Sequence, residues 1–93
     1  MTFTTDNLKA AANFRKHKVS FGEAESVFDD LFAVTIDDWQ HSEQEPREIV
    51  IGQSNIGRLL FVCFVERNEA VRLISAREAT RQERKKYEND ELN

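Results

Sequence analysis

The sequence predicts an α+β domain with two N-terminal helices, a four-stranded antiparallel sheet and a C-terminal helix. Helical periodicity occurs near both ends of the chain, and four short apolar segments follow one another between them. Strands that are joined in one run by short turns pair in an antiparallel sheet, and we expect the helices to cover one face of it. The 93 residues, 40% of them apolar, suit a single domain over residues 1–93 with a modest core.

The first helix is predicted over residues 7–17. Asp6 can cap it by accepting hydrogen bonds from the first free backbone N–H groups. Successive alanines raise the helix propensity of this segment. One stripe at helical spacing consists of Leu8, Ala11, Ala12 and Arg15.

A second helix is predicted from Phe21 to Asp29–Asp30. Ser20 and Glu23 have the S-x-x-E spacing of a capping box, in which each residue satisfies a backbone N–H of the other. The face expected to pack inward repeats at helical spacing and consists of Phe21, Ala24, Val27 and Phe28.

Four strands are predicted over residues 32–36, 47–53, 58–65 and 71–75. The third is apolar at nearly every position, which indicates a central strand covered on both faces. The turn at residues 54–57 contains an Asn and a Gly, which tolerate the positive φ of hairpin turns.

The last helix is predicted from Ala76 to Glu88, because Ser75 and Glu78 have a second capping-box spacing. It is crowded with cations, namely Arg77, Arg81, Arg84, Lys85 and Lys86. A helix with so few apolar positions does not dock deeply in a core. Two interpretations remain: a solvated helix with internal charge pairs, or an anion-binding surface, since guanidinium groups match phosphate oxygens.

Composition excludes several classes of function. The net charge of −4 argues against bulk attraction to nucleic acid, although the basic segments 9–18 and 58–86 flank an acidic segment at residues 23–48. A single cysteine excludes an internal disulfide and suits a reducing cytoplasm, where we expect the protein. No apolar run approaches a membrane span, so no membrane association is expected. The sequence contains no standard catalytic signature and no recognisable metal-ligand spacing, so neither a metal nor another cofactor is expected.

Four segments together resemble one known family. They are KAAANFRKHKVSFGEAESVFDD near the N-terminus, HSEQEPR in the middle loop, IGQS with a following GR at the hairpin, and RLISAREAT with the later ER and YE at the end. Their order and spacing resemble the BrnT family over about residues 6–88. Three places depart from the usual pattern: Thr4–Thr5 replaces a more usual acidic–aromatic pair, Lys18 stands where the family often has Gly, and Phe64 stands where Tyr is common.

The resemblance implies a toxin of a type II toxin–antitoxin pair with a fold similar to that of RelE-like ribonucleases. Such toxins block translation by cutting RNA, and an antitoxin named BrnA neutralises them by direct binding. The complex of the two represses its own operon. The resemblance therefore implies an RNA substrate, a BrnA-type antitoxin, and operator DNA contacted only through the complex.

Cleavage of RNA without a metal uses the 2′-hydroxyl as nucleophile. It needs a base for that hydroxyl, an acid for the leaving 5′-oxygen, and cations on the phosphorane oxygens. We expect Arg77, beside the N-terminus of the last helix, to be the principal phosphate and transition-state contact. The alternative for Arg77 is a salt bridge to Glu66 or Asp38.

The other candidate catalytic residues are Glu83, His17, Arg67 and Tyr87. Glu83 or His17 is the candidate base, but Glu83 also suits a helix salt bridge and His17 suits a dipole partner at a helix end. Arg67 is a further phosphate contact or part of a solvated strand face. Tyr87 either stacks on a base or anchors the helix on the sheet. The residues expected to bind RNA are Lys16, Arg72, Arg81 and Arg84.

Two classes of function remain open from the sequence. The first is a small metal-independent endoribonuclease toxin held by an antitoxin. The second is a non-catalytic interaction module whose acidic middle binds a basic partner and which acts only in a repressor complex. Direct operator binding by this chain alone is disfavoured by its negative charge and by the lack of a recognition-helix signature.

Overall fold

The computed structural model describes residues 1–41 and 45–91. The elements in chain order are β1 (Thr2–Thr4), α1 (Asn7–His17), α2 (Phe21–Ser26), the 3₁₀ turn η1 (Val27–Asp29), β2 (Val34–Asp37), the 3₁₀ turn η2 (Trp39–His41), β3 (Glu48–Gln53), β4 (Leu59–Arg67), β5 (Ala70–Glu78) and α3 (Arg81–Glu91). Part of the middle segment HSEQEPR lies outside the described residues. Within them, the helices are too short and too polar to span a lipid bilayer.

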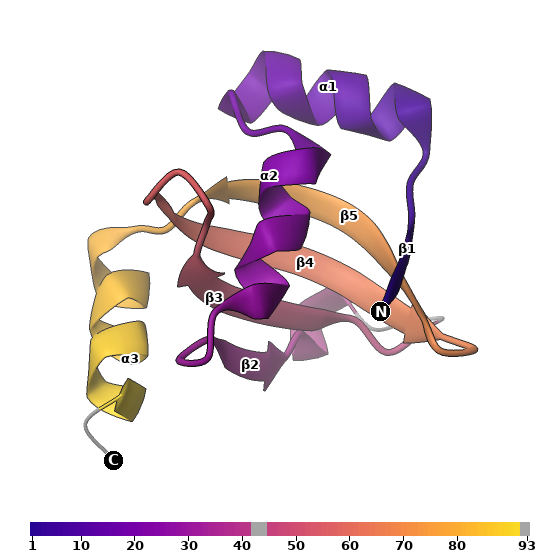
Figure 1. Ribbon diagram of the computed structural model, residues 1–93. Coiled ribbons are helices and arrows are strands. Elements are labelled where there is room, and N and C mark those ends of the chain that lie inside the picture. Colours follow the sequence, from indigo (N-terminus) through magenta and orange to yellow (C-terminus); the bar gives the residue numbers. More distant parts are fainter. Residues whose placement is uncertain (42–44, 92–93) are drawn as a thin grey trace.

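In the part of the chain that the structure describes, five strands form one sheet in the order β1-β5-β4-β3-β2 (Figure 1). The α+β class is confirmed, but the expected four-stranded antiparallel sheet is wrong, because β1 pairs with β5 in parallel. The short N-terminal segment is held there by Phe3, whose ring packs edge-on against Phe28 at 5.2 Å. A three-residue strand has no periodicity of its own, so only this long-range packing reveals it.

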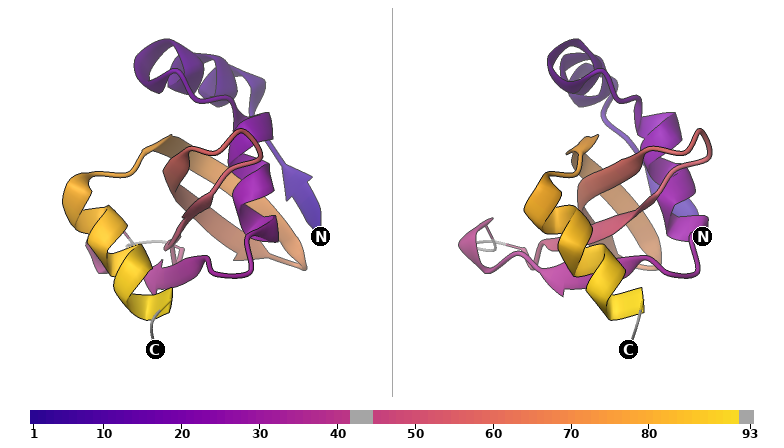
Figure 2. Two further views of the ribbon diagram at one scale, coloured as in Figure 1. Left: turned by 60° about the vertical axis from the view of Figure 1, so that its left-hand side comes forward. Right: turned by 90° about the vertical axis from the view of Figure 1, so that its left-hand side faces the viewer.

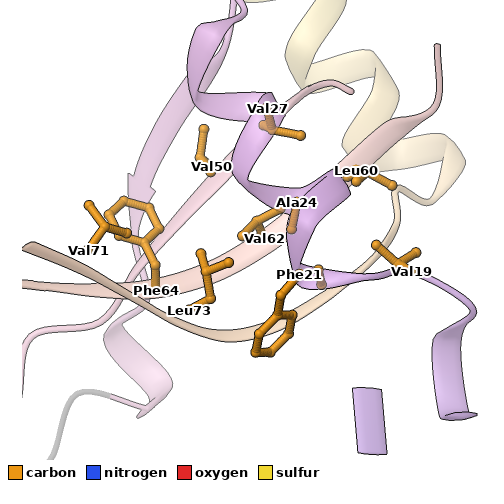
Figure 3. Close-up of a cluster of buried hydrophobic side chains, with 11 residues drawn as sticks. Val19, Phe21, Ala24, Val27, Val50, Leu60, Val62, Phe64, Val71 and Leu73 are labelled. Carbon is orange, nitrogen blue, oxygen red and sulfur yellow. The ribbon is translucent and has the colours of Figure 1, made fainter. Parts of the chain in front are cut away.

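The larger core lies between α2 and one face of the sheet (Figure 3). Phe21, Ala24 and Val27 are buried, as the helical spacing predicted. Phe64 of β4 lies beneath Phe28, with the ring centroids 5.0 Å apart. A tyrosine at position 64 would therefore direct its hydroxyl into the core rather than onto an open sheet surface. The departure from the family pattern at this position concerns packing.

The expectation that the helices cover one face of the sheet is wrong. Helix α3 packs on the face opposite α2 (Figure 2). A smaller apolar cluster lies under α3, built on Ile49, Ile51 and Leu59. Tyr87 contributes to this cluster, and its hydroxyl donates a hydrogen bond to Oδ2 of Asp30 at 2.7 Å. The polar helix therefore docks through a narrow face, and this hydrogen bond is a specific anchor.

The prediction that the last helix begins at Ala76 is wrong. Residues 70–78 are strand, and Ser75 pairs with Cys63 while Arg77 pairs with Phe61. The nine residues of β4 need a hydrogen-bonding partner along their length, and this requirement outweighs the local capping signal. The actual capping box lies five residues later: the N–H of Thr80 donates to Oε1 of Glu83 at 2.8 Å, and the N–H of Glu83 donates to Oγ1 of Thr80 at 3.2 Å.

Helix α1 is attached by a polar side chain instead of its apolar stripe. The stripe that begins with Leu8 is exposed, with Leu8 itself at 83%. Asn13 is buried instead, and its amide exchanges two hydrogen bonds with the backbone of Ala76, at 2.8 and 3.0 Å. Its Nδ2 also donates to the carbonyl of Val19 at 2.9 Å. This amide extends the hydrogen bonding of β5 past the end of β1.

The strand predicted over residues 32–36 begins later, at Val34. The Asp30 side chain accepts from the N–H of Phe32 at 2.9 Å, and its carbonyl accepts from the N–H of Ala33 at 3.1 Å. These bonds hold residues 30–33 in a turn and leave Phe32 exposed.

Candidate functional site

Arg77 lies on β5 at the margin of the sheet face that α3 covers. Its guanidinium carbon stands 4.1 Å from the ring centroid of Phe61, its partner on β4. Arg77 lies on the strand and not in the last helix, but its guanidinium group contacts the first turn of α3. Its ion-pair partner is Glu83, rather than the Glu66 or Asp38 considered from the sequence. The side chain is 35% exposed, so it is partly accessible to solvent.

Arg77 and Glu83 form a two-pronged ion pair. Nη1 donates to Oε1 at 2.8 Å and Nη2 donates to Oε2 at 2.9 Å. Burial alone would raise the pKa of Glu83, but hydrogen bonds from Arg77 and from Thr80 outweigh burial and lower that pKa below its ordinary value. The same hydrogen bond to Glu83 raises the pKa of Arg77. The pair therefore stays fully charged at neutral pH, and the carboxylate fixes the orientation of the guanidinium plane.

A cationic pocket of about 270 Å³ lies between α1 and β5. Its charged lining comes from Lys9, Lys16 and His17, and no acidic residue lines it among those that the structure describes. Ser75 lines the other wall and lies on β5 two residues before Arg77. Residues two apart on a strand are about 7 Å from each other, so the backbone of Arg77 lies about that far from the pocket wall at Ser75, although Arg77 does not line the pocket. The end of α1 and the start of α3 both lie where β5 ends (Figure 1).

The two other predicted strand arginines form a separate group. Arg67 and Arg72 line a pocket of about 290 Å³ at the far end of the β4–β5 hairpin. Arg67 is paired there with Glu45. Arg72 precedes Arg77 by five strand residues, which corresponds to about 16 Å. These cations are therefore too distant to share one phosphate with Arg77.

The predicted residues of α3 have different surroundings from one another. Arg81 and Arg84 are exposed, as expected for a solvated or RNA-facing helix. Glu83 and Tyr87 share the face that docks on the sheet, one bound to Arg77 and the other to Asp30. The structure thus brings together Arg77 with Glu83, Lys16 with His17, and Arg67 with Arg72.

A buried charge network, missed from the sequence, supports this arrangement. The carboxylate of Glu23 is 8% exposed and receives both Nε and Nη2 of Arg58, while Oγ of Ser54 donates to it at 2.7 Å. Arg58 also donates to the carbonyl of Lys18 at 3.0 Å. The N–H of Glu23 donates to Oγ of Ser20 as predicted, but its carboxylate serves Arg58 instead of completing a capping box. Glu23, Ser54 and Arg58 all stand in the segments that resemble the family, and this shared position was the signal in the sequence that could have indicated the network.

Cys63 behaves as a core residue. Burial raises the pKa of its thiol to about 11, with a further contribution from the nearby Asp38. Such a thiol stays protonated at neutral pH and is a poor nucleophile. Among the described residues, no group of three or more His, Cys, Asp or Glu side chains is arranged to hold a metal ion.

Comparisons with known proteins agree with the resemblance seen in the sequence. Residues 6–83 match a family model described as the ribonuclease toxin BrnT of a type II toxin–antitoxin system. The fold is similar to the crystal structure of the Brucella abortus ribonuclease toxin BrnT, with a TM-score of 0.66 and 26% sequence identity. The alignment covers 87% of this chain and 99% of that chain. A comparison with curated proteins gave no match.

Proposed function

Because this chain belongs to the BrnT family of ribonuclease toxins of type II toxin–antitoxin systems, we propose that it inhibits translation by cutting RNA without a metal ion. The observation that carries the proposal is the charged Arg77–Glu83 pair beside an acid-free cationic pocket. A chain whose net charge is −4 repels a polyanion as a whole, so binding of RNA requires a local cationic region of this kind. Translation takes place in the cytoplasm, and we propose that the chain acts there.

The proposed reaction is a transesterification within the RNA. The 2′-hydroxyl loses its proton to a base, its oxygen bonds to the adjacent phosphorus, and the bond from phosphorus to the 5′-oxygen breaks. An acid delivers a proton to that 5′-oxygen. The products are a 2′,3′-cyclic phosphate and a 5′-hydroxyl, and the extra negative charge of the phosphorane is the feature that a cation must stabilise.

Arg77 is the proposed contact to the phosphorane oxygens. The guanidinium group stays charged and offers donors in a planar fork, and part of it remains exposed beyond the Glu83 contact. Glu83 engages both oxygens with Arg77, and Oε1 also accepts from the N–H of Thr80. This occupancy favours a role for Glu83 in orienting Arg77, and any role as base requires it to release one of these donors.

His17 is the proposed acid or base, because an imidazole nitrogen can donate or accept a proton and this side chain lines the cationic pocket. Lys16 lines the same pocket and is a proposed phosphate contact. Arg67 and Arg72 are proposed contacts to the RNA backbone some nucleotides away, and Arg81 and Arg84 are proposed contacts on the exposed side of α3. Tyr87 was also a candidate for stacking on a base, but its hydrogen bond to Asp30 favours the anchoring role.

We further propose that an antitoxin of the BrnA type neutralises this chain by direct binding. A type II system pairs each toxin with an antitoxin protein, which supports the existence of such a partner. Operator DNA is proposed to be contacted only by the complex, because the chain alone is acidic.

The test is cleavage of a single-stranded RNA by the purified chain in the presence of EDTA, with the RNA ends analysed. The wild-type chain is expected to produce 2′,3′-cyclic phosphates, and Arg77→Ala is expected to lower the rate by at least about 100-fold. Arg15→Ala is the matched control, because Arg15 is exposed and has no proposed role. Circular dichroism establishes that each variant is folded. Cleavage that Arg77→Ala leaves unchanged, or that EDTA abolishes, contradicts the proposal.

A non-catalytic interaction module is the second candidate, and the two hydrogen bonds from Arg77 to Glu83 favour it. In that case the pair serves only to attach α3 to the sheet. A module predicts no cleavage by a well-folded wild-type chain and no growth arrest when the chain is produced without its partner.

A further inference from the structure

One edge of the sheet ends at β2, and backbone groups of this strand face outward. The N–H of Asp38 donates to the carbonyl of Arg47 at 2.9 Å, continuing the register in which Asp37 pairs with Glu48. Hydrogen-bonded pairs alternate along an antiparallel ladder. Positions 34, 36 and 38 therefore bond to β3, while the N–H and carbonyl groups of Thr35 and Asp37 point away from it. No strand pairs with these groups within residues 1–41 and 45–91.

Exposed apolar side chains lie at both ends of this strand. Leu31 and Phe32 precede it and are 95% and 56% exposed, and Trp39 follows it and is 83% exposed. We call Leu31, Phe32, Thr35, Asp37 and Trp39 together the β2 edge. An open strand edge flanked by large apolar groups is a template for pairing with another chain, and proteins normally block such edges.

The charge around the β2 edge indicates what kind of segment can bind there. The segment 23–48 is acidic in sequence, but two of its carboxylates, Glu23 and Glu45, are ion-paired with arginines outside it. Asp37 is exposed within β2 itself, and Asp29 is exposed in η1, which precedes β2 in the chain. This field repels RNA and the other phosphate-rich surfaces that the proposed substrate site attracts. Pairing with a second copy of β2 would bring the same acidic residues together, so a basic segment is the complementary occupant.

We propose that the β2 edge binds an extended segment of the antitoxin, basic and apolar in composition, as an added strand. The backbone groups of Thr35 and Asp37 supply the hydrogen bonds, and Leu31, Phe32 and Trp39 bury its apolar side chains. The proposal rests on the proposed function for the existence of that partner. Strands are about 4.8 Å apart, so β2 lies about 14 Å from β5, and this contact leaves the Arg77 side chain uncovered. Affinity for the antitoxin and RNA cleavage are therefore separable by mutation.

The sharpest perturbation is Thr35→Pro. Proline removes the outward N–H and places its ring in the path of an added strand, while the inward hydrogen bonds of residues 34 and 36 are kept. Thr35→Ala is the matched control, because it changes the side chain and keeps the N–H. A second pair compares Trp39→Ala with Leu8→Ala, an apolar residue with the same 83% exposure on a remote helix.

The probe is the proposed BrnA-type antitoxin as a purified protein, titrated calorimetrically against each folded variant. We expect Thr35→Pro to raise the dissociation constant at least about tenfold and Trp39→Ala about fivefold. Thr35→Ala and Leu8→Ala are expected to stay within about twofold of wild type. Amide hydrogen exchange adds an independent readout, because the N–H groups of Thr35 and Asp37 must become protected when the probe is bound.

Three outcomes overturn the proposal: wild-type affinity in Thr35→Pro and Trp39→Ala, unchanged exchange at Thr35 and Asp37 in a saturated complex, or no binding by the wild-type chain. RNA cleavage is measured in parallel without the probe, and we expect both variants to cleave as the wild type does. Absence of cleavage with binding intact overturns the ribonuclease proposal and leaves the docking proposal standing.

Discussion

The coupling between Arg77 and Glu83 is the energetic prediction on which the candidate site depends most directly. A double-mutant cycle with Arg77→Gln, Glu83→Gln and the double variant isolates it. Glutamine at position 83 keeps an oxygen that can accept from the N–H of Thr80, so the helix cap survives while the charge is lost. Contacts of Arg77 outside the pair, such as its packing over Phe61, cancel in the cycle.

The magnitude follows from the geometry and exposure of the pair. Two charge-assisted hydrogen bonds of 2.8 and 2.9 Å would contribute roughly 1.5–3 kcal/mol when shielded, whereas fully exposed ion pairs contribute less than about 1 kcal/mol. The side chains here are 35% and 20% exposed, which places the pair between these limits. We therefore expect a coupling free energy of about 1.5 kcal/mol at pH 7.

Urea unfolding followed by circular dichroism measures this coupling. For a domain of this size an m-value near 1.5 kcal/mol per M of urea is typical. The coupling free energy therefore corresponds to a difference of about 1 M in the urea concentration at the midpoint of unfolding. The pKa of Glu83 is lowered in the folded state, so its charge stabilises the fold fully above the ordinary value of 4.5 and progressively less as the pH falls through the folded pKa. The coupling must therefore shrink in acid. A coupling below about 0.5 kcal/mol at pH 7, or one that persists unchanged in acid, refutes the reasoning.

Three further predictions follow from other parts of the fold. Lys18 has a φ of 59° at the C-cap of α1, so Lys18→Gly should raise the free energy of unfolding by about 0.5–1 kcal/mol in urea titrations, and a loss of stability would contradict this account. Because the pKa of the Cys63 thiol is raised to about 11, a thiol reagent at pH 8 should label it only in denaturant, and rapid labelling of the folded chain would show that it is accessible. The hydrogen bond from Arg58 lowers the pKa of Glu23, so Glu23→Gln should lower the free energy of unfolding by about 2–3 kcal/mol at pH 7. The loss should become smaller as the pH falls below 4.5, because the wild-type carboxylate is then protonated. Equal losses at pH 7 and in acid, measured by thermal unfolding, would exclude an ionic origin.

Local patterns predicted the elements well where side-chain periodicity alone decides the structure. The second helix and the central strand β4 are of this kind, since their apolar spacing reports the core directly. The start of the last helix shows where such patterns fail. Ser75–Glu78 and Thr80–Glu83 both have the spacing of a capping box, and only the pairing of Ser75 with Cys63 decides between them. That pairing is tertiary, so it is invisible in a local segment.

The sequence predicted which residues belong to the candidate site better than it predicted which of them contact each other. Arg77 and Glu83 were both identified as chemically suitable, but their partnership depends on a strand that extends to residue 78 before α3 begins. Asn13 stands in the N-terminal segment that resembles the family, but its structural role was not predicted. Its partner, Ala76, lies 63 residues further along the chain. Contacts of such sequence separation carry no local signature.

The attachment of the N-terminus to β5 affects the order in which the protein can fold during synthesis. Both β1 and Asn13 find their partners only in residues 70–76, near the end of the chain. Long-range contacts of this kind form late, after the loop between them has closed. A growing chain on the ribosome therefore completes neither the sheet nor the pocket between α1 and β5 until β5 has emerged. Helix α1 cannot dock before β5 has been synthesised. A prematurely terminated product therefore lacks the surface on which the proposed activity depends.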